Sequence, residues 1–223
     1  MTADLARRLG AEALGSMMLT GVVIGSGILA LRLSGGNDGV ALLGNTAATA
    51  AILFVLITGL GPISGAHFNP AVTLVMAIRR SLSPPEAISY VVVQIVGCIL
   101  GAWLAHAMFE LPIIQTSTHA RNGFAQGLSE AVATFSLVTT ILLVSRWRAE
   151  AVPAAVALAI AAGYWWTAST SFANPAISIA RSMSDTFAGV RPEDVPGFVV
   201  GQIAGALTAW LVCGFLVSED GTP

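Results

Sequence analysis

Two copies of the tripeptide Asn-Pro-Ala carry the polar side chains that could do chemistry inside an otherwise apolar chain. The first copy is Asn69, Pro70 and Ala71, and the second is Asn174, Pro175 and Ala176. Proline suits the first position of a helix, because its missing N–H is not needed there and its fixed φ favours helical entry. Each asparagine can cap the helix that follows it in the sequence. Each can also offer a side-chain NH₂ to the oxygen of a small molecule.

Only a short apolar segment follows each motif, over residues 71–80 and 176–185. At 1.5 Å per residue, each segment makes roughly 15 Å of helix. The hydrocarbon core of a bilayer is about 30 Å thick. The two segments are therefore predicted to be half-helices that reach only the middle of a membrane.

The composition of the chain indicates a membrane protein. Of its 223 residues, 55% are hydrophobic and 10% are charged, and the mean hydropathy is +0.80. Soluble domains carry about 25% charged residues. Six stretches approach the roughly 20 apolar residues that cross a bilayer: 9–31, 40–60, 84–108, 123–145, 152–168 and 195–217. The predicted fold class is an all-α membrane protein with six transmembrane helices and two half-helices.

The chain also repeats itself. Residues 90–97 in the third span match residues 198–205 in the sixth at a constant offset of 108, and the two Asn-Pro-Ala motifs lie 105 residues apart. Each half holds three full crossings, so the two halves must face opposite ways. Inverted repeats bring their discontinuous helices together near the bilayer midplane. We therefore expect a single domain over residues 1–223, with repeats over approximately 9–108 and 123–217.

Two helix N-termini that meet at the midplane present partial positive charge and free N–H donors. Cations are repelled there, and a water molecule whose oxygen faces both asparagine amides cannot relay a proton. The site thus predicts a pore for neutral molecules. The simpler interpretation is that the asparagines only cap their helices, and the two roles are compatible.

The charges bear on location and partners. All ten basic residues are arginines, and six of them form three groups on one side of a six-span chain: Arg7 and Arg8, Arg79 and Arg80, Arg146 and Arg148. The positive-inside rule then predicts a multi-pass protein of the cell membrane with both termini in the cytoplasm. The formal net charge of −2 argues against nucleic acid as a partner.

The paired motifs, the six spans and a glutamate early in each half resemble the aquaporin and aquaglyceroporin family of major intrinsic proteins. The resemblance implies a right-handed helical bundle in which the half-helices enter from opposite faces. It also implies a homotetramer in which each protomer has its own pore for water and small uncharged solutes.

The residue after the second motif departs from the family pattern. Water-selective and glycerol-conducting members usually place an arginine there, whereas this chain has Ile177. By the family's spacing, the other filter positions are Thr49, Ala162 and Ser171. Because all four are uncharged, we expect a wider filter that admits glycerol, urea or undissociated arsenous acid. In this respect the chain resembles a bacterial subgroup that is associated with arsenic resistance.

Four further polar residues are candidates for pore or loop support. Glu12 and Glu130 lie inside predicted spans, either as a proton relay or, as the resemblance implies, as acceptors for N–H groups of the re-entrant loops. His67 either lines the pore or bonds to loop backbone. Arg181, one helical turn beyond Ile177, is either a displaced filter arginine or a cation that stabilises a helix C-terminus.

The function predicted from the sequence is a passive channel for water and small neutral solutes. The alternative is an ion-coupled secondary transporter, since such proteins also use inverted repeats and midplane half-helices. The sequence offers no plausible set of nucleophile, base and orienting residue, no metal-ligand cluster and no phosphate loop. We therefore expect neither an enzyme nor a cofactor.

Overall fold

The computed structural model describes residues 3–217, and their regular structure is entirely helical. Six long helices form the body of the molecule: α1 (Ala3–Leu33), α2 (Asp38–Ser64), α4 (Pro84–Met108), α5 (Phe124–Trp147), α6 (Val152–Trp166) and α8 (Val195–Val217). Two short helices lie among them: α3 (Pro70–Ile78) and α7 (Pro175–Ser182). Short 3-10 turns, Ala149–Ala151 and Pro192–Asp194, precede α6 and α8.

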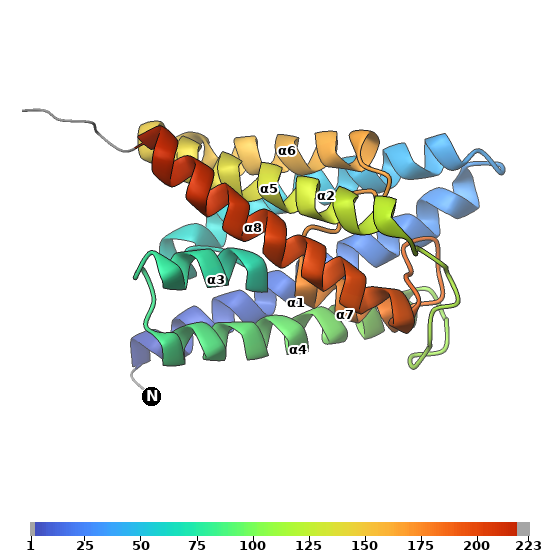
Figure 1. Cartoon of the computed structure of the whole chain (residues 1–223). Helices are drawn as coiled ribbons and strands as arrows, with labels where there is room; N and C mark the ends of the chain where they lie inside the picture. The colour runs from blue at the N-terminus through green and yellow to red at the C-terminus, as the bar shows by residue number, and fades with distance from the viewer. Residues whose placement is uncertain (1–2, 218–223) are drawn as a thin grey trace, which may run out of the picture.

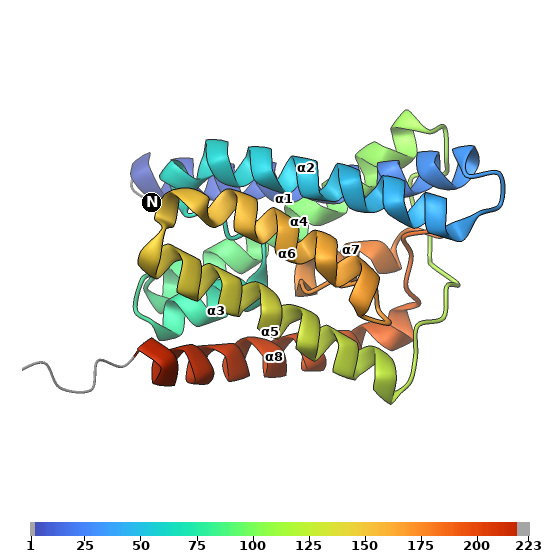
Figure 2. The ribbon, with the colours of Figure 1, turned by 90° about the horizontal axis from the view of Figure 1, so that it is seen from above.

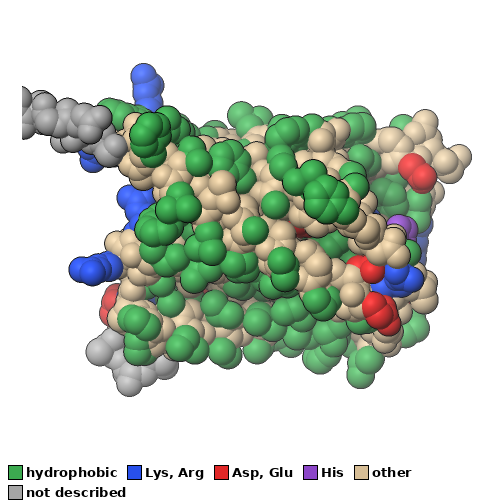
Figure 3. Space-filling model, in the orientation of Figure 1, with side chains coloured by type: hydrophobic (Ala, Val, Ile, Leu, Met, Phe, Trp, Pro, Cys, Tyr) green, Lys and Arg blue, Asp and Glu red, His purple; other side chains and the backbone are tan. Residues whose placement is uncertain are grey.

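The long helices have the length and composition of membrane spans. Among the described residues, six helices are long and apolar enough to cross a bilayer. Hydrophobic side chains cover the middle of the molecule, while charged side chains gather at its two ends (Figure 3). The start of α1 and the end of α8 lie at the same end of the bundle (Figure 1), as an even number of crossings requires. The predicted all-α membrane fold is confirmed.

The two short helices enter the bundle from opposite ends and point toward each other (Figure 2). α3 packs against α4 of its own half and α8 of the other, and α7 packs against α8 and α4 in the mirrored way. In the same manner, α1 packs on α4 and α2, and α5 packs on α8 and α6. The contacts therefore follow the repeat that the sequence indicates.

Asparagine and proline fix where each short helix begins. The Oδ1 atom of Asn69 accepts a hydrogen bond from the backbone N–H of Ala71 at 2.9 Å. Asn174 does the same for Ala176 at 3.0 Å and for Ile177 at 3.3 Å. A proline occupies the first turn of both helices. These caps satisfy N–H groups that would otherwise be unpaired deep in the bundle.

Glycines allow the long helices to approach closely. A Cβ atom added at Gly101 of α4 would lie 2.2 Å from the carbonyl oxygen of Met17 in α1. The equivalent atom at Gly205 of α8 would lie 2.1 Å from the carbonyl oxygen of Ala131 in α5. Both helix pairs therefore depend on small residues at the crossing, as in other membrane bundles.

Candidate functional site

A cavity of about 410 Å³ runs through the centre of the bundle. Four long helices line it with residues spaced four apart, which places them on one face of each helix. These lining residues are Leu19 and Val23 of α1, Thr49, Leu53 and Ile57 of α2, Leu137, Ile141 and Ser145 of α5, and Val152, Val156, Ile160 and Tyr164 of α6. The walls that they form are mostly apolar.

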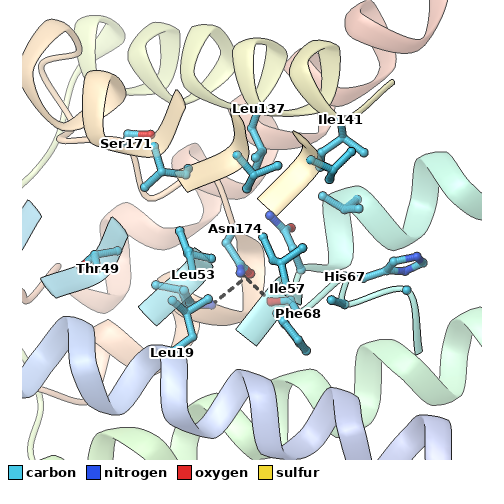
Figure 4. A pocket seen from close by; sticks show the side chains of 18 of the residues that line it. Leu19, Thr49, Leu53, Ile57, His67, Phe68, Leu137, Ile141, Ser171 and Asn174 are labelled. Carbon is cyan, nitrogen blue, oxygen red and sulfur yellow. Dashed lines mark hydrogen bonds between the residues drawn. The ribbon is translucent and has the colours of Figure 1, made fainter. Parts of the chain in front are cut away.

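The two Asn-Pro-Ala motifs meet in the middle of this cavity. Thr49 and Ser171 lie toward one end of the cavity and His67 toward the other, with Asn174 between them (Figure 4). We call these ends the filter end and the His67 end. Asn69 and Asn174 both line the cavity. The half-helices thus bring residues 105 apart in sequence to one point.

Each asparagine side chain crosses to the loop of the other half. The Nδ2 atom of Asn69 donates to the carbonyl oxygen of Ala173, and that of Asn174 donates to the carbonyl oxygen of Phe68, both at 2.7 Å. A carboxamide NH₂ has two donors. Since one donor is used in the cross-bond and Oδ1 caps the helix, one N–H of each asparagine is left for a solute. Capping therefore leaves a donor on each asparagine that a solute can use.

The loops before the half-helices hold left-handed backbone at matched positions. The φ angles are 52° at Ala66 and 49° at Phe68 in the first loop, and 52° at Ser171 and 49° at Ala173 in the second. Left-handed backbone costs a residue other than glycine about 1–3 kcal/mol. These pairs keep the 105-residue offset of the asparagines. The surrounding structure must therefore hold both loops in place.

Glu12 holds the first loop. Its carboxylate is fully buried and accepts hydrogen bonds from the backbone N–H groups of His67 and Phe68, at 3.0 and 2.7 Å. The Ser64 hydroxyl and the Gln94 amide donate to the same carboxylate at 2.7 and 2.8 Å. All of these donors belong to or support the first re-entrant loop.

Glu130 does the same for the second loop. It is also fully buried, and it accepts from the N–H groups of Phe172 and Ala173 at 2.9 and 2.8 Å and from the Gln202 amide at 2.6 Å. Neither Glu12 nor Glu130 is among the residues that line the cavity. This geometry favours loop support over a proton relay.

Three of the four predicted filter residues line the filter end, namely Thr49, Ser171 and Ile177. Ala162 is exposed on the surface of α6 and does not line the cavity, whereas Tyr164 does. The Tyr164 hydroxyl lies 3.3 Å from the Thr49 hydroxyl, so α6 and α2 are joined across this end. Arg181 also lines the cavity.

At the opposite end, His67 lines the cavity and also bonds to the loop structure. Its Nδ1 atom lies 3.1 Å from the Thr73 hydroxyl, and its ring centroid is 5.4 Å from that of Tyr90. His67 thus lies at the cavity, and the hydrogen-bond partner of its ring is a side chain of α3 rather than the loop backbone that was the alternative prediction. Arg79, at the end of α3, lines the same cavity.

The permanently charged side chains that line the cavity are arginines. Among the described residues, its ionisable lining side chains are His67, Arg79, Arg181 and the weak acid Tyr164, and no carboxylate lines it. The N-termini of α3 and α7 add partial positive charge at the centre. Such a path disfavours cations and is compatible with neutral molecules.

Tyr164 and Arg121 lie at or beside the filter end but are not among the residues predicted from the sequence. A signal for Tyr164 was present, because Val156, Ile160 and Tyr164 follow each other at the four-residue spacing of one helix face. Arg121 gives no such signal, because it comes from the long loop between α4 and α5.

Comparison with known proteins agrees with this geometry. The family model for the major intrinsic proteins matches residues 1–151. Aquaglyceroporin AqpS of Rhizobium meliloti (strain 1021) is 53% identical over 214 residues, which cover 96% of this chain and 91% of the relative. The probable aquaporin AqpM of Archaeoglobus fulgidus is 29% identical over 98% of this chain and all of the relative.

A solved structure shares the fold. The X-ray structure of the aquaglyceroporin from Plasmodium falciparum superposes with a TM-score of 0.69 at 22% identity, covering 96% of each chain. At this level of identity, the likeness concerns the fold alone.

Proposed function

The chain belongs to the major intrinsic protein family, whose members are membrane channels for water and small solutes, and we propose that it admits uncharged solutes larger than water. It is a passive channel rather than an enzyme. The observation that carries the preference for uncharged solutes is the meeting of two asparagine donors at the tips of opposed half-helices inside one apolar-walled cavity.

The preference for uncharged solutes rests on desolvation. An ion that enters the cavity loses its water shell, and the lining offers no carboxylate to compensate a cation. A neutral hydroxyl or amide needs only a few hydrogen bonds. The spare N–H groups of Asn69 and Asn174 can supply these bonds at the centre.

The preference for solutes larger than water rests on Ile177. Its side chain is apolar and lines the filter end at the position where the family usually places an arginine. An isoleucine neither fills that space with a guanidinium nor holds water there by hydrogen bonds. Glycerol, urea and undissociated arsenous acid are the solutes that we propose. The name of the Rhizobium relative, an aquaglyceroporin, supports the glycerol class.

We further propose that four copies assemble into a homotetramer in the cell membrane, with both termini in the cytoplasm. The family resemblance supports the tetramer. The three arginine groups at residues 7–8, 79–80 and 146–148 support the orientation, because positive charge favours the cytoplasmic side. Residues 1–223 would form one channel domain of two inverted repeats.

Stopped-flow light scattering on proteoliposomes tests the proposed solute range. Water, glycerol, urea and arsenous acid are compared at one pH, with protein-free vesicles as the control. We expect all four to cross faster than in the control vesicles. Fast water flux with complete exclusion of the three larger solutes would refute the wide filter and leave a strict water channel.

A further inference from the structure

Arg181 is a buried cation at the filter end of the cavity. Only 2% of its surface is exposed, and it lines the cavity beside Ile177 and Ser171. Within residues 3–217, no carboxylate forms an ion pair with it. Its Nε donates to the carbonyl oxygen of Ala188, and no described residue accepts a hydrogen bond from its terminal amino groups. These amino groups are not among the buried side-chain nitrogens that lack a partner, so they are accessible from the cavity and can donate to a molecule inside it.

A merely structural role for Arg181 would be to stabilise the C-terminus of α7. In that role, the guanidinium would bond to the last carbonyls of its own helix. Its observed acceptor, Ala188, instead lies in the following loop. The guanidinium therefore bonds to the loop that follows α7 rather than to the last carbonyls of the helix, and it lies beside the cavity.

Phe172 and Arg121 complete this arrangement. The Cζ atom of Arg181 lies 3.2 Å from the centroid of the Phe172 ring, and the Cζ atom of Arg121 lies 5.3 Å from the same centroid. Guanidinium groups are attracted to aromatic rings at such distances. One ring thus orients two arginines that come from different parts of the chain.

Arg121 also fixes the segment that holds Arg181. It donates to the carbonyl oxygens of Gly189 at 2.9 Å, Phe187 at 3.4 Å and Ser169 at 3.4 Å. Two of these carbonyls flank Ala188, the acceptor of Arg181. Arg121 therefore ties the loop that contains Phe172 to the loop that contains Ala188.

We propose that Arg181 supplies the positive charge and the hydrogen-bond donors of the filter from one helical turn beyond Ile177, and that Arg121 positions it. The proposal rests on the proposed channel. Solute oxygens would meet the free amino groups of Arg181, and the hydroxyls of Thr49 and Tyr164 line the same end. The aperture beside Ile177 could then stay wide while cations, including hydronium, are still repelled.

The test compares Arg181→Gln with the wild type in proteoliposomes, using a pH-sensitive dye for proton leak and stopped flow for glycerol and water. Removing the charge should raise the proton leak at least about tenfold, because a nearby unit charge in a protein environment changes an energy barrier by more than 1.4 kcal/mol. Glycerol flux should change relative to water flux. The matched control is Arg32→Gln, because Arg32 also stacks on a phenylalanine, Phe109 at 5.2 Å, but is exposed and does not line the cavity.

Arg181→Lys keeps the experiment decisive if the glutamine variant fails to fold. The lysine retains the charge but not the planar donor group, so we expect low proton leak with an altered ratio of glycerol to water flux. The proposal is overturned if Arg181→Gln shows the proton leak and the ratio of glycerol to water flux of the wild type. If only Arg181→Lys folds, a wild-type flux ratio in that variant overturns it. Wild-type glycerol flux is measured in the same series. Its absence would refute the proposed function, whatever the Arg181 variants do.

Arg121→Gln tests the positioning role. We expect a smaller rise in proton leak than for Arg181→Gln, and no additional rise when the two substitutions are combined, since Arg121 would act only through Arg181. If the rise in proton leak of the double variant equals the product of the two single rises, Arg121 does not position Arg181.

Discussion

Ile177 is the residue at which this chain departs most from the expected pattern of its family. It is the third residue of α7, where its backbone N–H is capped by Asn174 and its side chain faces the cavity. The helix cap therefore does not depend on the side chain at 177. The side chain at this position can therefore change the width of the pore without disturbing the cap of the half-helix.

We predict that Ile177→Arg narrows the filter. A guanidinium there would fill space and compete with solutes for hydrogen bonds, and it would lie near the existing charge of Arg181. Glycerol flux should fall by roughly tenfold or more, while water flux falls less, since filter discrimination of this size follows from small changes in fit. Stopped-flow measurement of both fluxes gives the ratio. An equal loss for the two solutes would mean that residue 177 does not set the aperture.

We predict that Glu130→Gln destabilises the fold rather than abolishing a proton-coupled step. The new NH₂ group would replace an acceptor that faces the N–H groups of Phe172 and Ala173. Losing hydrogen bonds to a buried carboxylate should cost roughly 3 kcal/mol or more. The apparent Tm in detergent, followed by tryptophan fluorescence, measures this loss.

The matched control is Glu150→Gln. Glu150 is exposed and lies in the 3-10 turn that precedes α6. The Tm of this variant should equal that of the wild type. An unchanged Tm for Glu130→Gln together with loss of gradient-driven uptake would instead support a proton relay.

At the level of helices, the crossing of α5 and α8 depends on Gly205. A methyl group there would collide with the Ala131 carbonyl, so Gly205→Ala should destabilise the protein by about 1–3 kcal/mol. Gly214→Ala in the same helix meets nothing within 4 Å and should be neutral or slightly stabilising. Thermal unfolding in detergent compares the two variants. Similar Tm values for both would contradict the proposed close packing.

The loop between α4 and α5 should respond to pH through His119. Partial burial, followed by the charges of Arg121 and Arg181, lowers the pKa of His119, while Asp185 opposes this shift. Because the folded state prefers neutral histidine, the stability is fully present above the unfolded pKa of about 6.5 and decreases as pH falls below it. His119→Gln should therefore show a smaller loss of Tm between pH 7.5 and 5.5 than the wild type. The difference should be small, since the residue is largely exposed. An identical pH dependence of Tm in the two proteins would show that His119 does not contribute to it.

The helices were predictable because their signals are local. The predicted spans 84–108 and 195–217 coincide with α4 and α8, and the predicted half-helices start within one residue of α3 and α7. Apolar length and a proline after asparagine suffice for such predictions. The repeat offset also indicated which segments would meet.

The detailed filter was not predictable in the same way. Thr49 joins Tyr164 across 115 residues, and Arg121 reaches Ser169 across 48. Contacts of this kind depend on how helices and loops pack, which a single sequence does not reveal. The family's spacing predicts Ala162 at the filter, whereas the lining residues of α6, spaced four apart, lead to Tyr164.

Over the whole molecule, two inverted halves build one path from the same parts. Each half contributes a buried glutamate, a left-handed loop and a capped half-helix, and each asparagine bonds to the loop of the other half. The symmetry ends at the filter, where Arg181, Phe172 and Arg121 belong to the second half or to the loop that leads into it.

Glycerol uptake into proteoliposomes, measured with and without proton or sodium gradients, tests passive conduction of neutral solutes most directly. We predict that the uptake rate rises linearly with glycerol concentration, has a low activation energy and is the same with or without either gradient. Saturable uptake that depends on a proton or sodium gradient would contradict the channel and would establish a coupled transporter.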